Sequence, residues 1–196
     1  MSAKSILRAT APSVDPLFLE RWSPRAFDGS SIDQPDLDVI LEAARWAPSA
    51  FNAQPWRFIF ACRQDPDWGR FLSLLLPFNA AWAADASVLL FVLSDTLVRL
   101  PGAEEATPSR SHSFDTGAAW ALLALQATRL GYATRGMAGV DFTRARIELD
   151  VPERFQIETA IALGRNTGGH SAPRPERSSD RKPVAEYAIR GKFTGG

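Results

Sequence analysis

Two arginines flank a serine near the N-terminus, in the order Arg21, Trp22, Ser23, Arg25. At this spacing the guanidinium and hydroxyl groups can converge on one anion, and arginine binds phosphate through charge-assisted, bidentate hydrogen bonds. A surface turn with two solvated arginines would show the same pattern, and short motifs often occur by chance. The segment therefore predicts a phosphate site only if other segments point to the same ligand.

A second polar cluster lies where an amphipathic helix is predicted to give way to a strand, and it contains Pro48, Ser49 and Asn52. A loop in this position exposes backbone groups, and an asparagine can donate and accept hydrogen bonds along the edge of a planar ligand. Pro55 and Trp56 follow in the same stretch. We interpret these two as packing residues, because a proline stops the helix and a tryptophan at a strand start usually fills the core.

A third candidate is the Ala138-Gly139 pair, which follows a predicted strand. Glycine lets the backbone approach a ring face closely, although a tight turn between a strand and a helix needs the same residue. Together these segments favour binding of a flat, anionic ligand.

His112 and Asp115 stand close together with serines on both sides of the histidine, which invites comparison with a hydrolase. The Gly-x-Ser-x-Gly elbow is absent from the sequence, and the segment opens a predicted helix, where Ser and Asp are ordinary caps. We expect His112 and Phe114 to border a substrate pocket instead. The sequence also lacks Gly-x-Gly-x-x-Gly, a phosphate-binding Gly-Lys-Ser/Thr and His-Glu-x-x-His, so it predicts neither a dinucleotide-binding domain of the usual kind nor a metal site.

Composition narrows the class of protein. The chain has 196 residues, 45% of them hydrophobic, with 22 basic and 22 acidic side chains. This balance gives no general attraction to nucleic acid or to a membrane surface. Cys62 is the single cysteine, which excludes an intrachain disulfide and fits a reducing compartment. We expect a cytoplasmic protein whose partner is a small molecule.

The hydrophobic pattern predicts alternating helices and strands, and hence an α/β or α+β fold. Helices are predicted over 16–21, 35–46, 68–76, 79–84, 114–130, 142–149 and 184–188, and strands over 58–62, 87–93, 132–137 and 156–163. We expect one domain over residues 1–196 with its core at about 16–187, a lid-like excursion at 95–113 and a linker at 165–182. The helix over 114–130 is apolar on several sides, which predicts burial between two layers or two subunits.

Three segments together resemble the nitroreductase family. They are Arg-Trp-Ser-Pro-Arg-Ala-Phe at 21–27, the Pro-Ser-x-x-Asn-x-Gln-Pro-Trp stretch at 48–56, and Gly-Met-Ala-Gly-Val-Asp at 136–141 followed by Ile-Ala-Leu-Gly at 161–164. Phe78-Asn79 and Arg181-Lys182-Pro183 are weaker matches. All occur in family order across nearly the whole chain.

The resemblance implies an α+β fold with a central mixed, mainly antiparallel sheet covered by helices, and an intertwined homodimer with FMN at the interface. It implies a ping-pong reaction in which NADH or NADPH reduces the flavin and leaves. An electron-poor acceptor, such as a nitroaromatic or a quinone, then enters the same cleft. The flavin N5 carries the chemistry, so no catalytic side chain is expected. The implied cofactor contacts are Arg21, Trp22, Ser23, Arg25, Asn79, Ala138, Gly139 and Arg181, with Pro48, Ser49 and Asn52 from the other subunit.

The chain departs from the family pattern at two positions. Trp82 and Ser179 stand where lysines near the flavin are common, so either other groups, such as Arg181 or backbone amides, stabilise the reduced flavin, or the potential of the flavin is lower. Two other functions stay open: a flavin-sequestering dimer without catalysis, and the same fold performing dehalogenation, ene reduction or dehydrogenation. The sequence determines neither the natural acceptor nor the choice between NADH and NADPH.

Overall fold

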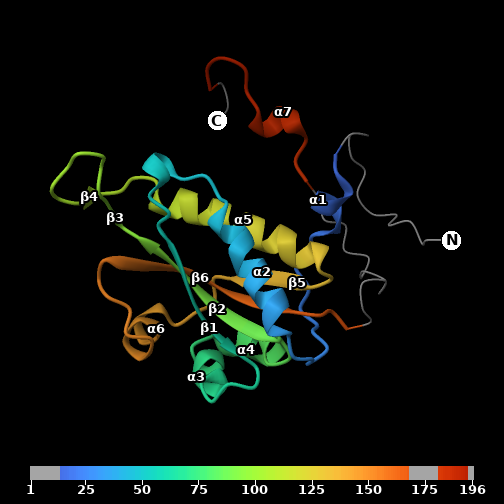
Figure 1. The fold of residues 1–196 in the computed structure, drawn as a ribbon. Coiled ribbons are helices and arrows are strands. Elements are labelled where there is room, and N and C mark those ends of the chain that lie inside the picture. The colour runs from blue at the N-terminus through green and yellow to red at the C-terminus, as the bar shows by residue number, and fades with distance from the viewer. Residues whose placement is uncertain (1–13, 168–180, 194–196) are drawn as a thin grey trace. The chain divides into compact units, whose positions relative to one another are not determined.

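The computed structural model describes residues 14–167 and 181–193, which form an α+β fold (Figure 1). Its main sheet has four strands in the order β1-β2-β6-β5. The strands are β1 (Trp56–Cys62), β2 (Val88–Asp95), β5 (Ala133–Met137) and β6 (Phe155–Gly164). We predicted a mixed, mainly antiparallel sheet, and the three pairings among these described strands are all antiparallel.

Every predicted helix and strand has a counterpart, with ends shifted by a few residues. The helices of the unit that spans residues 15–172 are α1 (Pro16–Glu20), α2 (Gln34–Arg45), η1 (Ala50–Asn52), α3 (Trp68–Ser73), α4 (Pro77–Ala83), α5 (His112–Arg129) and α6 (Phe142–Glu148). The terminal parts of the chain form a second unit, in which α7 (Val184–Tyr187) is the described helix. In the described part of the chain, no helix is both long and apolar enough to cross a membrane.

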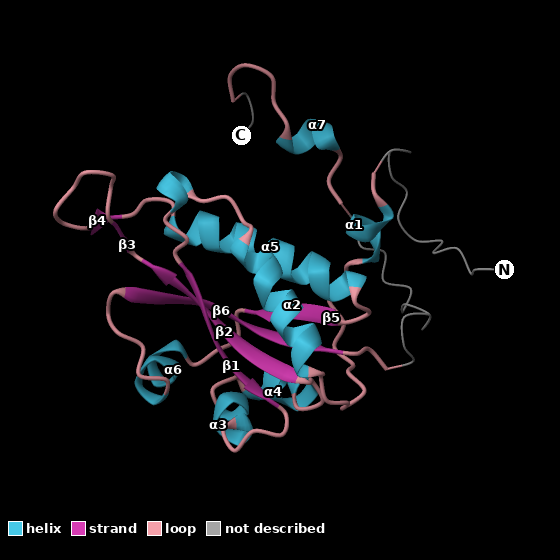
Figure 2. Ribbon diagram, viewed as in Figure 1, coloured by secondary structure: helices cyan, strands magenta, loops and turns pink. Residues whose placement is uncertain are grey.

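Helices cover both faces of the sheet, and β2 shows why (Figure 2). All eight of its residues are buried. Because side chains alternate along a strand, Leu89 and Phe91 join the core formed with α3, α4 and α6, whereas Leu90 and Val92 join the core formed with α2 and α5. The strand predicted over 87–93 is therefore a central strand that is covered on both faces.

The helix α5 packs against the sheet through Ala119, Leu123 and Ala127, which are fully buried. The same core includes Leu37 and Ile40 of α2, and the two helices cross on one face of the sheet (Figure 1). Much of α5 is thus buried between the sheet and α2 within one chain, whereas Phe114 in its first turn is exposed. Asp33 stands at the N-cap of α2, but its side chain makes no capping hydrogen bond.

The predicted excursion over 95–113 is shorter than expected at both ends. Asp95 is the last residue of β2, and α5 already begins at His112. Between them, β3 (Leu97–Val98) and β4 (Thr107–Pro108) pair as a small antiparallel ladder. The pattern missed these strands because each has only two residues. A role for this hairpin as a lid stays a prediction.

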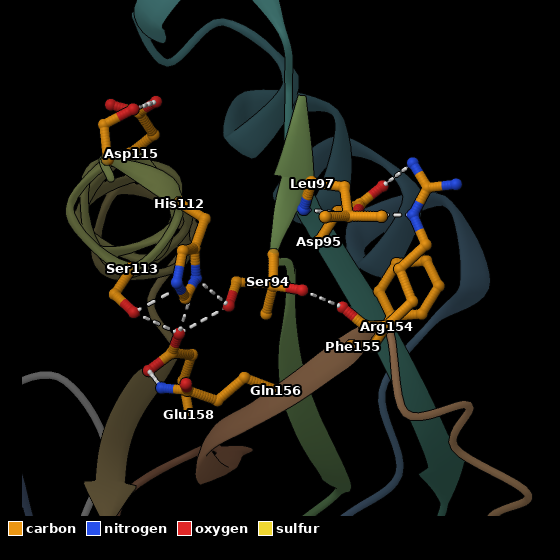
Figure 3. Close-up of polar contacts among 12 residues, drawn as sticks. Ser94, Asp95, Leu97, His112, Ser113, Asp115, Arg154, Phe155, Gln156 and Glu158 are labelled. Carbon is orange, nitrogen blue, oxygen red and sulfur yellow. Dashed lines mark hydrogen bonds and ion pairs between the residues drawn. The ribbon is translucent and has the colours of Figure 1, made fainter. Parts of the chain in front are cut away.

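An ion pair joins the end of β2 to the segment before β6. Arg154 Nε and Nη2 donate to the two carboxylate oxygens of Asp95, each at 2.6 Å (Figure 3). Burial of Asp95 by itself raises its pKa, but the hydrogen bonds from Arg154 and from the Leu97 N–H outweigh burial and lower the pKa below its ordinary value. Asp95 therefore stabilises the fold in its ionised form.

Stability is expected to depend on the charge of Asp95. Since its pKa is lower in the folded chain than in the unfolded chain, the stabilisation is present above the unfolded pKa of about 4 and is lost as pH falls through the folded value. Asp95→Asn should lower the free energy of unfolding by about 1–2 kcal/mol at pH 7, and by less at pH 3. Urea denaturation at both pH values measures this difference. Asp85→Asn, at an exposed carboxylate 3.8 Å from Arg63, is the control, and equal losses at both pH values would contradict the assignment.

Candidate functional site

Three of the predicted segments meet around Arg135 of β5. The Arg135 Nη1 donates to the backbone oxygen of Ser23 at 2.6 Å. Its guanidinium lies 5.4 Å from the centre of the Trp82 ring of α4, and Phe27 stacks on the same indole at 6.3 Å. The arginine–serine motif, α4 and the end of β5 therefore form one region, and Arg135, which was not predicted, joins them.

Asn79 and Gly139 are in direct contact within this region. The Asn79 Nδ2 donates to the Gly139 oxygen at 3.1 Å, and the Leu76 N–H donates to the same oxygen at 3.0 Å. A Cβ at position 139 would lie 2.4 Å from the Asn79 Nδ2, a separation that real Cβ atoms do not tolerate. A side chain at position 139 would displace the Asn79 amide, so glycine permits this close approach, and Ala138 beside it is exposed.

The region is rich in guanidinium groups. The Arg21 Nη1 donates to the Ser23 hydroxyl at 3.3 Å, and the Arg25 guanidinium lies 5.0 Å from the centre of the exposed Phe78 ring. With Arg135, three guanidinium groups belong to this region. Trp22, which follows Arg21 in the sequence, is half-buried. These groups fit a ligand that combines a phosphate with a flat ring.

Trp82 of α4 lies between an aromatic ring and a guanidinium group. Its indole packs against Phe27, and Arg135 from the neighbouring strand brings a positive charge to the same place. The Trp82 Nε1 is buried and has no hydrogen-bond partner among the residues that the structure describes. A charged residue among the mostly buried residues of β5 was the available signal for Arg135.

The loop with Pro48, Ser49 and Asn52 lies elsewhere in the chain. It leads into β1, one edge of the sheet, whereas Ala138 and Gly139 follow β5, the other edge. Three strand spacings of about 4.8 Å separate these edges. In Figure 1 the loop lies at the N-terminal end of α5. One chain therefore does not bring this loop to Asn79 and Gly139.

Pro48 and Asn52 are exposed in this loop, and the Ser49 Oγ accepts a hydrogen bond from the Gln54 N–H at 3.0 Å. Pro55 and Trp56 are buried, and Trp56 packs with α2 and α5. Their predicted packing role is confirmed. The exposed residues of the loop are free to face another molecule.

His112 belongs to a polar cluster that joins three elements (Figure 3). The Ser94 Oγ lies 2.5 Å from the Glu158 Oε1 and 2.8 Å from the His112 Nδ1. The Ser113 hydroxyl also donates to Glu158, at 2.6 Å. Since a carboxylate only accepts, the single Ser94 hydroxyl proton goes to Glu158, and the Ser94 oxygen accepts from the His112 Nδ1–H. In the neutral ring, Nε2 is then the nitrogen that can take or return a proton.

Glu158 reaches this cluster because of a bulge in β6. Val92 of β2 pairs with Thr159, but the next residue, Leu93, pairs with Ile157, so Glu158 is the extra residue. A bulge redirects the side chain of its extra residue. The alternation of apolar residues gave no sign of this shift, and neither Glu158 nor Ser94 was predicted.

Two other predicted site residues, Phe114 and Arg181, lie on the surface. Phe114 is 82% exposed on the first turn of α5. Arg181 is exposed and precedes α7 in the second unit. Ser179 and most of the predicted linker lie outside the described residues. Ser111 occupies the N-cap position of α5, but its side chain makes no capping hydrogen bond. Its hydroxyl donates to Asp115 instead.

Comparisons with known proteins show which proteins this chain is similar to. The pattern of the Nitroreductase family matches residues 19–67. An NADH dehydrogenase of Thermus thermophilus is 32% identical over 189 residues, covering 81% of this chain and 90% of that protein. An oxygen-insensitive NADPH nitroreductase of Helicobacter pylori is 34% identical over 79 residues, covering 40% of this chain and 37% of that protein. The crystal structure of an oxidoreductase containing FMN superposes with a TM-score of 0.87 at 44% identity, covering 100% of both chains.

Proposed function

The chain belongs to the nitroreductase family, and we propose that it is an FMN-dependent oxidoreductase. It passes hydride from NADH or NADPH to an electron-poor acceptor, such as a nitroaromatic or a quinone, in a ping-pong reaction. The observation that carries this proposal is the meeting of the Arg21–Arg25 motif, Asn79 and Gly139 around Arg135. A structure with the same fold at 44% identity contains FMN, which supports the cofactor.

The residues fit FMN part by part. Arg21, Ser23 and Arg25 offer guanidinium and hydroxyl donors to the phosphate. The Ala138-Gly139 turn provides backbone groups for the ring edge, and Asn79 is held beside it. Bound FMN supplies the hydride-transfer chemistry at its N5. The protein binds and orients the ring and controls which molecules reach it.

A homodimer completes the site in this proposal, because Pro48, Ser49 and Asn52 are too far from Gly139 in one chain. An apolar surface surrounds their loop: Trp46 is 73% exposed, Phe51 67% and Phe114 82%. Large apolar side chains gathered on one face mark an association surface. Light scattering of the flavin-loaded protein should give the mass of a dimer, and a monomer that retains FMN would contradict this arrangement.

The purified protein is expected to be yellow or to become yellow when FMN is added. NADH or NADPH should bleach the flavin absorbance under anaerobic conditions, and a nitroaromatic or quinone should restore it. A colourless protein that takes up no FMN would overturn the proposal. Bound FMN that neither nucleotide reduces would favour the sequestering dimer. Reoxidation by an enone or a halogenated aromatic, tested in parallel, separates ene reduction and dehalogenation from nitro or quinone reduction.

In this proposal His112 borders the acceptor site and returns a proton to the acceptor after hydride arrives. Glu158 and Ser94 hold the ring through Nδ1, so Nε2 would pass to the acceptor a proton that it first takes up from solvent. His112→Gln is expected to leave flavin reduction by NADH or NADPH unchanged and to slow quinone-dependent reoxidation by about 100-fold, the lower range for general acid catalysis. Stopped-flow absorbance measures both half-reactions. Equal rates of reoxidation in the variant and the wild type would remove His112 from the site.

A further inference from the structure

The loop that precedes β1 has an unusual backbone. Four non-glycine residues of the described chain have positive φ, and three of them lie here: Phe51 at 54°, Asn52 at 54° and Gln54 at 50°. Such conformations are unfavourable for residues with a Cβ, and they persist only when the surroundings hold them in place. The loop therefore needs contacts that fix its shape.

One of these contacts comes from a buried carboxylate on α5. Asp115 is only 5% exposed, and its Oδ2 accepts from the Ala50 N–H at 3.1 Å and from the Ser111 hydroxyl at 2.9 Å. The Ala50 bond joins residues 65 positions apart. The first turn of a helix also favours a negative charge. The Asp115 side chain thus holds the backbone of the loop at Ala50.

The other contacts of the loop are mostly internal. The Ser49 Oγ accepts from the Gln54 N–H at 3.0 Å, and the Ser49 oxygen accepts from the Asn52 N–H at 3.0 Å. At the far end, the Pro55 oxygen accepts from the Asp95 N–H at 2.9 Å. Among the hydrogen bonds of the described residues, the bond from the Ala50 N–H to Asp115 is therefore the one that joins the exposed part of the loop to a side chain outside it.

We propose that Asp115 is a positioning residue for the flavin site of the other subunit. By holding the Ala50 N–H, its carboxylate keeps Pro48, Ser49 and Asn52 in the conformation that contacts the ring. This inference rests on the proposed function, since it takes the loop as a flavin contact. Asp115 does not touch the flavin; it acts through the loop.

Loss of the Asp115 bond is expected to weaken FMN binding without unfolding the protein. Asp115→Ala should raise the dissociation constant of FMN at least 10-fold, and Asp115→Asn should raise it less, because the amide oxygen can still accept from Ala50. Ala50→Pro removes the same bond from the donor side, at the first position of η1, where proline is tolerated. Thr116→Val is the matched control, since the buried Thr116 Oγ1 has no hydrogen-bond partner in the described part of the chain.

Titration of the apoprotein with FMN, followed by flavin fluorescence, gives the dissociation constants, and thermal unfolding of the apoprotein reports folding. Near-wild-type Tm with weakened FMN binding in both Asp115→Ala and Ala50→Pro supports the inference. Wild-type FMN affinity in either folded variant would overturn it. A wild-type protein that binds no FMN would instead overturn the proposed function.

A mixed dimer tests whether the loop acts on the other subunit. Chains carrying Arg21→Ala and chains carrying Asp115→Ala are given different tags, co-expressed and purified by both tags. If the loop serves the partner, one site of the mixed dimer carries both changes and the other carries neither. One FMN per dimer should then bind with wild-type affinity, although both parent homodimers bind weakly. Two weak sites in the mixed dimer would overturn the assignment to the other subunit.

Discussion

Gly139→Ala is expected to raise the dissociation constant of FMN by about 100-fold, which corresponds to a loss of about 3 kcal/mol. The new methyl group would lie 2.4 Å from the Asn79 Nδ2 and 3.7 Å from the Leu76 Cδ1. Asn79 must then move and give up its 3.1 Å bond to the Gly139 oxygen. Overpacking costs about 1–3 kcal/mol and a lost buried hydrogen bond about 1 kcal/mol or more. Both changes act on groups proposed to face the ring.

Fluorescence titration of the apoprotein with FMN measures this effect, and circular dichroism confirms that the variant folds. Gly69→Ala is the matched control, since a Cβ at Gly69 in α3 meets nothing within 4 Å. We expect the control to bind FMN like the wild type and to be slightly more stable, because alanine favours helix. Wild-type FMN affinity in Gly139→Ala would show that the ring does not approach this turn.

Arg21→Ala is expected to weaken FMN binding by roughly 1.5–3 kcal/mol, the scale of a hydrogen bond to a charged group. This corresponds to an increase of about 10- to 150-fold in the dissociation constant. The physical reason is that the Arg21 guanidinium lies beside the Ser23 hydroxyl, at 3.3 Å, and both groups can converge on one phosphate. Dialysis followed by flavin absorbance measures how much FMN each protein retains.

The shape of the side chain matters as much as its charge in this assignment. Arg21→Lys keeps the positive charge but loses the planar fork that binds phosphate through two bonds, so an intermediate affinity is expected. Arg70→Ala, at an exposed arginine paired with Asp67 on α3, is the control for loss of a positive charge. Full retention of FMN by Arg21→Ala would count against the phosphate assignment, and higher salt should weaken FMN binding by the wild type.

Several elements could be predicted because their signals are local. Leu37, Ile40, Leu41 and Ala44 recur at helical spacing, and all of them except the half-buried Leu41 are buried in α2. The continuous apolar run of β2 predicted a strand covered on both faces, and all of its residues are buried. The two-residue strands β3 and β4 were missed, since so short a ladder leaves no period to detect. Trp56 was predicted to be a packing residue because large apolar side chains at strand starts are commonly buried, and it is.

The residues that support the site could not be predicted in the same way. Arg135 contacts Ser23, which is 112 positions away in the sequence. Glu158 joins His112 and Ser94 only because a bulge shifts the register of β6 by one residue. Asp115 had the sequence signature of a helix cap, yet its carboxylate binds the backbone of a strained loop 65 residues earlier.

The sequence by itself therefore determined the order of the elements, the faces they bury and the motifs of the nitroreductase family. These features depend on neighbouring residues, whose spacing is written directly in the chain. Only the tertiary structure decided which charges accompany Trp82, what holds the loop before β1, and that this loop lies away from Gly139 within one chain. The reason is physical: hydrogen bonds and ion pairs between distant residues depend on strand order and register, which local spacing does not encode.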